Sequence, residues 1–306
     1  MFLALGAGLV PALCAATNRV SYYDPTDPAS PHKEVDCTLV TGTTTTLTQG
    51  WYAVNADVTI NGRITVSGSG VHLILCDGAT LNATNGVRLT GLNSLTIYGQ
   101  REGTGAIFAL YPSRYNAGIG GDNGEKGGTL TVNGGWMKVW GGEYGAAIGG
   151  GCAADGGKLV VNGGEIIAEG YNGSAGIGGG DDGSGGEVEI NGGHVTAIGS
   201  SRSTTRQAAA GIGAGRPKDN SPGPGTVKIT GGTVIAVAGT AQVSGNAAQA
   251  IGVNLDNAST DTGTLTLGHV MVFSPDERRD ALRGVEPHGN LPPDHFGAHR
   301  ILHARI

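Results

Sequence analysis

The segment that decides the fold reads TLTVNGGWMKVWGGEYGAAIGG over residues 129–150 and returns, with changes, as KLVVNGGEIIAEGYNGSAGIGG over residues 158–179. The phrase around its last isoleucine occurs five times, at spacings of 29, 29, 35 and 39 residues, centred on Ile119, Ile148, Ile177, Ile212 and Ile251. Short strands separated by glycine corners at such a period indicate a solenoid, in which each repeat buries its apolar face against its neighbour.

Alternation within each repeat predicts which side chains enter the core, because every second residue of a strand lies on the same face. Before the Asn-Gly-Gly corner the inward pairs are Leu130/Val132, Leu159/Val161, Val188/Ile190, Val227/Ile229 and Leu265/Leu267. After it they are Met137/Val139, Ile166/Ala168, Val195/Ala197 and Val234/Ala236. With the Ala-Ile-Gly segment as a third side, the sequence predicts an all-β, three-sided parallel β-helix. Its coiling should be right-handed, the usual hand of parallel crossovers.

The composition of the chain excludes some classes of function. The chain has 306 residues, of which 58 are glycine and only 14% are charged, and its formal net charge is −6. Nucleic-acid binding needs a clustered basic face to neutralise phosphates, so 19 Lys and Arg residues make that role improbable.

Both ends of the chain differ from the repeats. Residues 1–16 contain the apolar run FLALGAGLVPALCAA, which is typical of a secretory signal peptide and too short to span a membrane. Residues 17–48 form a polar lead-in and cap, residues 49–270 the β-helix with irregular first rungs, and residues 271–306 a capping tail. Ser274-Pro275-Asp276-Glu277 predicts the start of a short helix in that tail.

Three cysteines would remain after removal of the signal peptide. Cys37 and Cys76 form a disulfide in one interpretation of an exported protein. In the other interpretation, Cys76 is a small buried hydrophobic residue at the end of the run VHLILC.

The outward residues after the Asn-Gly-Gly corner provide the best candidate binding site. Stacked coils lie about 4.8 Å apart, so residues at equal offsets should form ladders. Two indoles beside carboxylates, a lysine and a histidine are what a sugar ring requires, namely an apolar platform with polar groups at its rim. In the alternative, the indoles only cover the outer face of the sheet. The candidate ligand-binding residues are Trp136, Lys138, Trp140, Tyr144, Glu165, Glu169, Tyr171 and His194.

Acidic residues suggest two further sites. Asp122, Asp181 and Asp182 follow the Ile-Gly segments and could form a ridge that binds Ca²⁺ through oxygen ligands, or a solvated edge that opposes aggregation. Glu187 and Glu189 lie about 6.6 Å apart along one strand, which suits a glycosidase. Their predicted neighbours Lys158 and Lys228 would lower both carboxyl pKa values, whereas a general acid needs a raised one.

The tail holds a third pattern. His295, His299 and His303 recur every four residues, so on a helix they would share one face suited to a transition metal. The alternative is an incidental polar face.

The block GWYAVNADVTINGRITVSGSGVHLILCDGATL over residues 50–81, the segment SLTIYGQ over residues 94–100 and the repeated Gly-Ile-Gly and Asn-Gly-Gly units add a family resemblance. Together they resemble the bacterial extracellular β-helical proteins described as carbohydrate-binding domain-containing. The resemblance implies a pectate-lyase-like solenoid at the cell surface or secreted, and it supplies no catalytic motif.

These patterns favour recognition of a polysaccharide or of a host or cell-wall glycan, without turnover. The first alternative is a β-helical polysaccharide lyase or glycoside hydrolase with its site in rungs 51–115. The second is a structural stalk or adhesin module without a small ligand.

Overall fold

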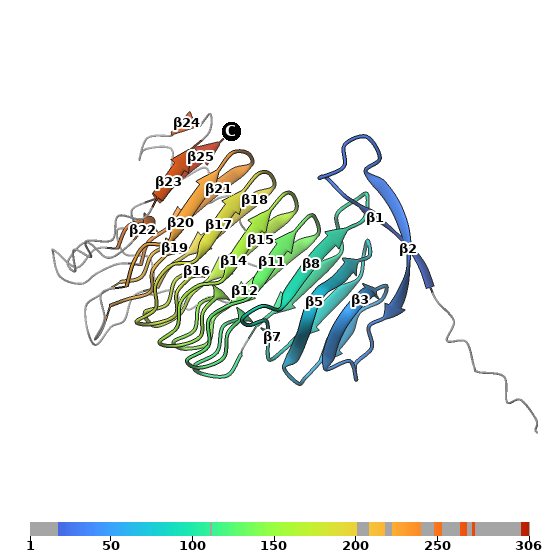
Figure 1. The fold of residues 1–306 in the computed structure, drawn as a ribbon, viewed down its shortest axis with the longest axis horizontal. Coiled ribbons are helices and arrows are strands. Elements are labelled where there is room, and N and C mark those ends of the chain that lie inside the picture. The colour runs from blue at the N-terminus through green and yellow to red at the C-terminus, as the bar shows by residue number, and fades with distance from the viewer. Residues whose placement is uncertain are drawn as a thin grey trace, which may run out of the picture.

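The computed structural model describes residues 18–110, 112–200, 208–217, 222–239 and 248–252, together with three short strands in residues 264–267, 271–272 and 301–305. Its described residues form strands and connecting turns, stacked as successive coils of a parallel β-solenoid (Figure 1). The all-β parallel architecture predicted from the repeats is therefore confirmed.

Each regular coil contributes one strand to each of three parallel stacks. The first holds β7 (Val87–Arg88), β10 (Ile119–Gly120), β13 (Ile148–Gly149), β16 (Ile177–Gly178), β19 (Ile212–Gly213) and β22 (Ile251–Gly252). The second holds β8 (Ser94–Gly99), β11 (Thr129–Val132), β14 (Lys158–Val161), β17 (Glu187–Ile190), β20 (Thr226–Ile229) and β23 (Thr264–Leu267). The third holds β4 (Val58–Ile60), β6 (Thr80–Ala83), β9 (Ala106–Ala109), β12 (Trp136–Trp140), β15 (Glu165–Glu169), β18 (His194–Ile198) and β21 (Thr233–Val237).

The first coils are less regular, as the sequence predicts. The long strand β5 (Ile64–Leu75) pairs with β7 through its beginning and with β8 through its end, so it joins the first two stacks into one sheet. Strand β3 (Thr46–Val54) pairs with β5 and shifts register between Thr48 and Gly50.

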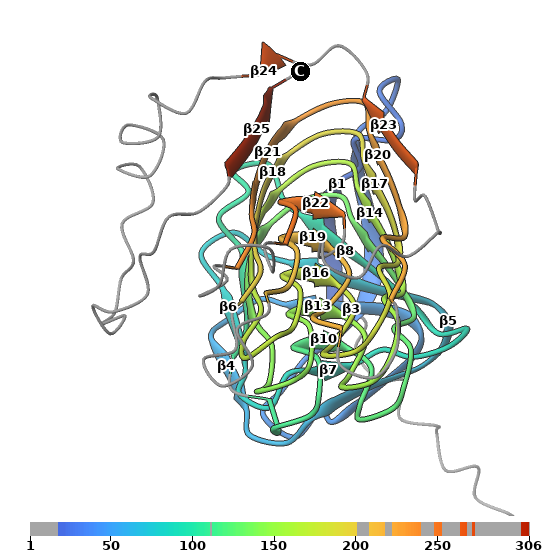
Figure 2. The same ribbon diagram turned by 90° about the vertical axis from the view of Figure 1, so that its left-hand side faces the viewer.

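The core lies between the stacks, and Figure 2 shows the first stack enclosed between the other two. The inward side chains predicted for β11, β14, β17 and β20 are at most 3% exposed, and those predicted for β12, β15, β18 and β21 are at most 1% exposed. Burial of these apolar side chains supplies the main stabilisation of stacked coils. The side chains of Leu265 and Leu267 lie outside the described residues.

Glycine allows the coils to approach at the first stack. Gly149 has a φ of +137°, and a Cβ at this position would lie 2.1 Å from the carbonyl oxygen of Gly178 in the next coil. The Ile-Gly phrase recurs because the backbone itself fills the space where any other side chain would begin.

Side-chain amides link neighbouring coils at the Asn-Gly-Gly corner. Asn162 Nδ2 donates to Asn133 Oδ1 over 2.9 Å, and Asn191 Nδ2 donates to Asn162 Oδ1 over 3.0 Å. The hydroxyl of Thr230 donates to Asn191 Oδ1 over 2.6 Å and extends this asparagine ladder by one coil.

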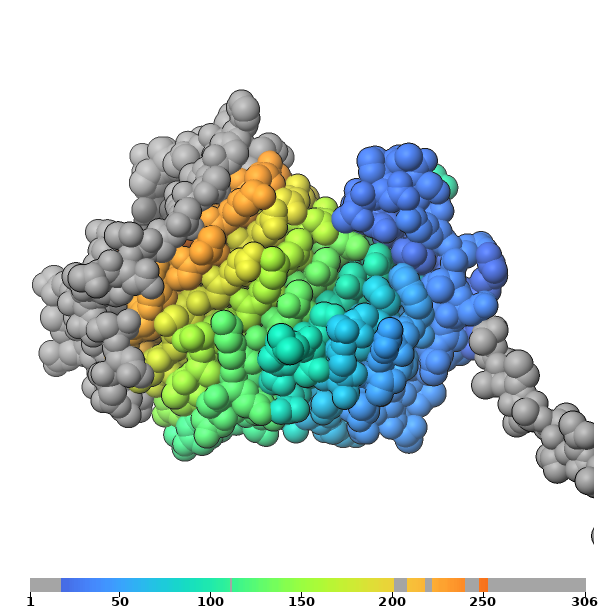
Figure 3. Space-filling view, in the orientation of Figure 1, coloured from blue at the N-terminus to red at the C-terminus, as the bar shows by residue number. Residues whose placement is uncertain are grey.

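The N-terminal cap is a hairpin of β1 (Asn18–Tyr23) and β2 (His32–Leu39), and β2 also pairs with β3. Tyr22 of the hairpin packs 4.9 Å from the ring of Trp51 and 4.8 Å from that of Tyr98, measured between ring centroids. His72 stacks on Trp51 at 4.2 Å. In Figure 3 the N-terminal residues, in blue, stand beyond the diagonal bands formed by the coils.

The tail differs from its prediction where it is described. Strand β25 (Ile301–Arg305) pairs antiparallel with β21 and with β24 (Met271–Val272), so His303 belongs to a strand. The prediction of a helix that aligns His295, His299 and His303 is therefore wrong at His303, because its backbone pairs with β21 instead of forming helical hydrogen bonds. Ser274, Pro275, Asp276 and Glu277, the predicted helix start, lie outside the described residues.

Candidate functional site

The third stack carries the predicted ladders in the predicted register. Trp136 is level with Glu165, and the next coils place His194 and Thr233 at the same offset. At the far end of the strand, Trp140 is level with Glu169. Because inward and outward residues alternate, both indoles of β12 lie on its outer face, about 13 Å apart along the strand.

Each indole has a neighbour that holds it in place, and both are half-buried. The ring of Phe108, from β9, meets that of Trp136 edge to face at 4.9 Å. The ammonium group of Lys138 lies 5.3 Å from the ring centre of Trp140, a cation–π contact. Two supported indoles with a lysine between them therefore form an aromatic surface on the outer face of β12.

Carboxylates flank this surface on β15. Glu165 is exposed, whereas burial raises the pKa of the Glu169 carboxyl above its usual range. The positive charge of Lys138 and a hydrogen bond with Trp140 oppose that rise. Glu169 is thus a carboxyl in an apolar setting at the rim of the surface, and His194, on β18, is exposed beside Glu165.

The two tyrosines predicted to extend the platform occupy different positions. Tyr144 is only 8% exposed, so its place in an exposed platform is wrong: its ring lies under Tyr115, with centroids 5.4 Å apart. Tyr171 is 57% exposed, and by the register of β12 and β15 it is level with Gly142. The unpredicted residue at this corner is Tyr115, which is 40% exposed.

The predicted calcium ridge is divided into separate ion pairs. Asp122 pairs with Arg63 at 2.7 Å and with Arg88 at 3.4 Å. Both carboxylate oxygens of Asp181 accept from Arg216, and Asp182 adopts a left-handed backbone with φ of 65°. In the described part of the chain, no three His, Cys, Asp or Glu side chains gather to hold a metal ion.

The paired glutamates of β17 are bound to lysines, as the register predicts. Lys158 Nζ lies 2.6 Å from Glu187, and Lys228 Nζ lies 2.7 Å from Glu189. The hydrogen bond from Lys228 lowers the pKa of Glu189, which is the opposite of what a general acid needs. This geometry argues against a glycosidase pair on β17.

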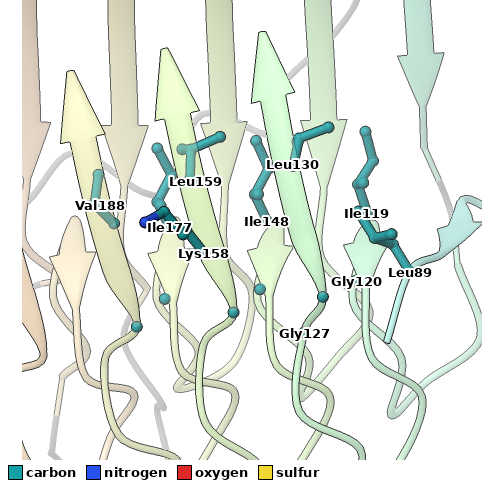
Figure 4. A pocket seen from close by; sticks show the side chains of 15 residues that line it. Leu89, Ile119, Gly120, Gly127, Leu130, Ile148, Lys158, Leu159, Ile177 and Val188 are labelled. Carbon is teal, nitrogen blue, oxygen red and sulfur yellow. The ribbon is translucent and has the colours of Figure 1, made fainter. Parts of the chain in front are cut away.

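Two hollows among the described residues lie apart from the aromatic surface of β12. A void of about 20 Å³ lies in the core among Ile119, Leu130 and Ile148, with room for about one water molecule (Figure 4). An open groove of about 390 Å³ runs outside the second stack, floored mostly by glycines and edged by Lys126, Lys158 and Glu187.

Cys37 and Cys76 are free thiols in the described part of the chain. The predicted disulfide between Cys37 and Cys76 is therefore not formed in this structure. Cys76 is 8% exposed, which confirms the interpretation of it as a buried small residue. Burial also raises the pKa of Cys37 to about 11.

Comparison with known proteins leaves the resemblance untested, since no family model, curated protein or solved structure matches the chain. Among the described residues, no helix has the length and apolar character needed to cross a membrane.

Proposed function

We propose that this protein is a right-handed parallel β-helix that binds a polysaccharide or another glycan without turning it over, secreted or at the cell surface. The observation that carries the proposal is the pair of outward indoles on β12, Trp136 and Trp140, held by Phe108 and Lys138.

The chemistry of this surface suits a sugar. Pyranose rings present patches of C–H bonds that stack on flat aromatic rings, while their hydroxyl groups need hydrogen-bond partners at the rim. Lys138 donates, the exposed carboxylate of Glu165 accepts, and His194 does either according to its tautomer. Glu169 adds a partly buried carboxyl beside Trp140.

Binding without turnover is supported by the state of the two paired carboxyl groups on β17. Retaining glycosidases need two carboxyl groups about 5–5.5 Å apart, and inverting ones need them about 6.5–9.5 Å apart. Glu187 and Glu189, the pair whose spacing along the strand suits the inverting type, are neutralised by lysines.

A glycan-array screen of residues 17–306 tests the proposal, with the wild type beside Trp136→Ala/Trp140→Ala. The expected result is binding to at least one glycan family that the double variant loses by about tenfold or more. Thermal unfolding of both proteins shows whether the variant keeps its fold.

Other results contradict the proposal in different ways. Binding that survives the double variant places the site elsewhere. Release of unsaturated or reducing ends favours the lyase or hydrolase alternative. Absence of binding to any glycan leaves the indoles as a cover for the outer sheet, which favours a structural module.

A further inference from the structure

The corner that follows β12 and β15 carries a second aromatic surface, made by Tyr115 and Tyr171. Tyr171 comes two residues after Glu169, the neighbour of Trp140, so it continues the β12 surface around the corner. Tyr115 belongs to the preceding coil, since the backbone N–H of Tyr144 donates to the carbonyl of Arg114. The exposed rings thus lie on two coils that are about 9.6 Å apart.

The ring of Tyr115 is packed from below, and the backbone of Tyr171 is held in a turn. Tyr115 stacks on the buried ring of Tyr144 with an interplanar angle of 16°, and the guanidinium of Arg114 lies 5.4 Å from the Tyr115 ring centre and 5.2 Å from the Tyr144 ring centre. Tyr171 starts a tight turn in which the Ser174 hydroxyl accepts from the Tyr171 N–H and donates to its carbonyl, each over 2.9 Å. The packed ring of Tyr115 therefore loses little conformational freedom when a ligand binds.

The charges at this corner cancel one another. Arg114 pairs with Glu143 through two nitrogens, and the hydrogen bond from Arg114 lowers the pKa of Glu143. Asn172 Nδ2 also donates to Glu143 Oε1, over 3.0 Å, which secures the carboxylate from the next coil. The Arg114 side chain stays 55% exposed, with its charge balanced by Glu143, and the phenol hydroxyls of Tyr115 and Tyr171 and the amide of Asn172 add uncharged polar groups at this corner.

We infer that this corner is a subsite for an uncharged sugar residue. A neutral oligosaccharide would lie along β12 and follow the protein surface around the corner, across Tyr171 and Tyr115. The inference rests on the proposed function, because it extends the surface of Trp136 and Trp140. A closed Arg114–Glu143 pair offers neither a free cation for a uronate nor a free anion for an amino sugar, whereas exposed aromatic faces bind sugars of any charge. Neutrality of the ligand follows from that pairing.

The length of the oligosaccharide distinguishes the subsite from the main surface, because only a longer oligosaccharide reaches both. We would titrate neutral hexasaccharides of glucose and of mannose, their disaccharides and hexagalacturonate by calorimetry. The wild type should bind a neutral hexasaccharide about tenfold more tightly than its disaccharide, and hexagalacturonate more weakly. Tyr115→Ala/Tyr171→Ala should reduce this gain with length, because the hexasaccharide would lose its contacts at the corner.

Tyr23→Ala is the matched control, because Tyr23 is 37% exposed on the N-terminal hairpin, away from this corner. The single variant Tyr171→Ala, at the most exposed of these tyrosines, is measured as well in case the double variant misfolds. It should lose about half of the affinity gained with oligosaccharide length, on a logarithmic scale. An unchanged gain in a folded tyrosine variant overturns the subsite while the proposed function stands. Tighter binding of hexagalacturonate overturns the neutral class, and a wild type that binds no sugar overturns the proposed function itself.

Discussion

Arg216 and Asp181 form a two-pronged ion pair inside the solenoid: Nε to Oδ1 and Nη2 to Oδ2 are each 2.7 Å, with side chains 2% and 5% exposed. A buried pair of this kind adds little net stability over apolar residues, but removal of one partner leaves the other charge buried and uncompensated. The pair therefore makes two successive corners depend on each other.

Asp181→Asn should lower the free energy of unfolding by about 3–5 kcal/mol, because it breaks a buried ion pair in which both carboxylate oxygens accept from Arg216. Urea unfolding measures the change. The matched control is Glu187→Gln, which breaks the exposed pair with Lys158 and should cost less than about 1 kcal/mol. Equal losses in the two variants would contradict the role assigned to burial.

Gly149→Ala should prevent normal folding, because its Cβ would meet the carbonyl of Gly178 at 2.1 Å and neither backbone can retreat without moving a coil. Gly62→Ala is the control: there the nearest atom to a new Cβ is a side-chain carbon of Thr45 at 3.6 Å. That substitution should be neutral or stabilising by up to about 1 kcal/mol. Yield of folded protein and thermal unfolding compare the two, and a well-folded Gly149→Ala would refute the backbone contact.

Stability should fall as the pH drops from 7.5 to 5.5 because of His72. Burial lowers the pKa of this histidine below 6.5, so the unfolded chain takes up the proton at a higher pH than the folded one. The stabilising contribution is complete above about pH 6.5 and is lost as the pH falls. Urea unfolding at both pH values measures the loss, which His72→Phe should reduce. The same pH dependence in wild type and variant would exclude His72 as the cause.

Asn162→Ala should cost about 1–2 kcal/mol, because it removes two amide links: Asn133 Oδ1 loses its donor in the ladder and Asn191 Nδ2 loses its acceptor. Asn61→Ala, at an exposed Asn-Gly turn, serves as the control and should change stability by less than about 0.5 kcal/mol. Thermal unfolding distinguishes them. If both variants have the same melting temperature as the wild type, the ladder contributes nothing to stability.

The regular coils could be predicted from the sequence because their information is local and repeated. A constant spacing of 29 residues sets Trp136 beside Glu165 and Lys158 beside Glu187, and period-two alternation assigns inward and outward faces. The same repeat cannot reveal contacts that occur once. Tyr22, Trp51, His72 and Tyr98 meet in the N-terminal cap from four separate strands, with no pattern that joins them.

The site was predicted only in part for a related reason. Glycine-rich corners carry no alternation, so Tyr144 and Tyr171 looked equivalent in sequence although one is buried under Tyr115 and the other projects from a turn. Likewise, Arg63, which makes the shorter of the two ion pairs with Asp122, lies 59 residues earlier in the sequence. Electrostatic partners across coils are visible only once the coils are stacked.

The close glycine contact of the first stack has a consequence for how such a chain can diversify. Its strands stay in register although seven residues lie between Trp140 and Ile148 and thirteen lie between Ile198 and Ile212. The additional residues enter the chain between strands, outside the paired positions of the first and third stacks. Corners can therefore change in length and composition over evolutionary time while the coil stays constant, so new surface chemistry can arise without a new fold.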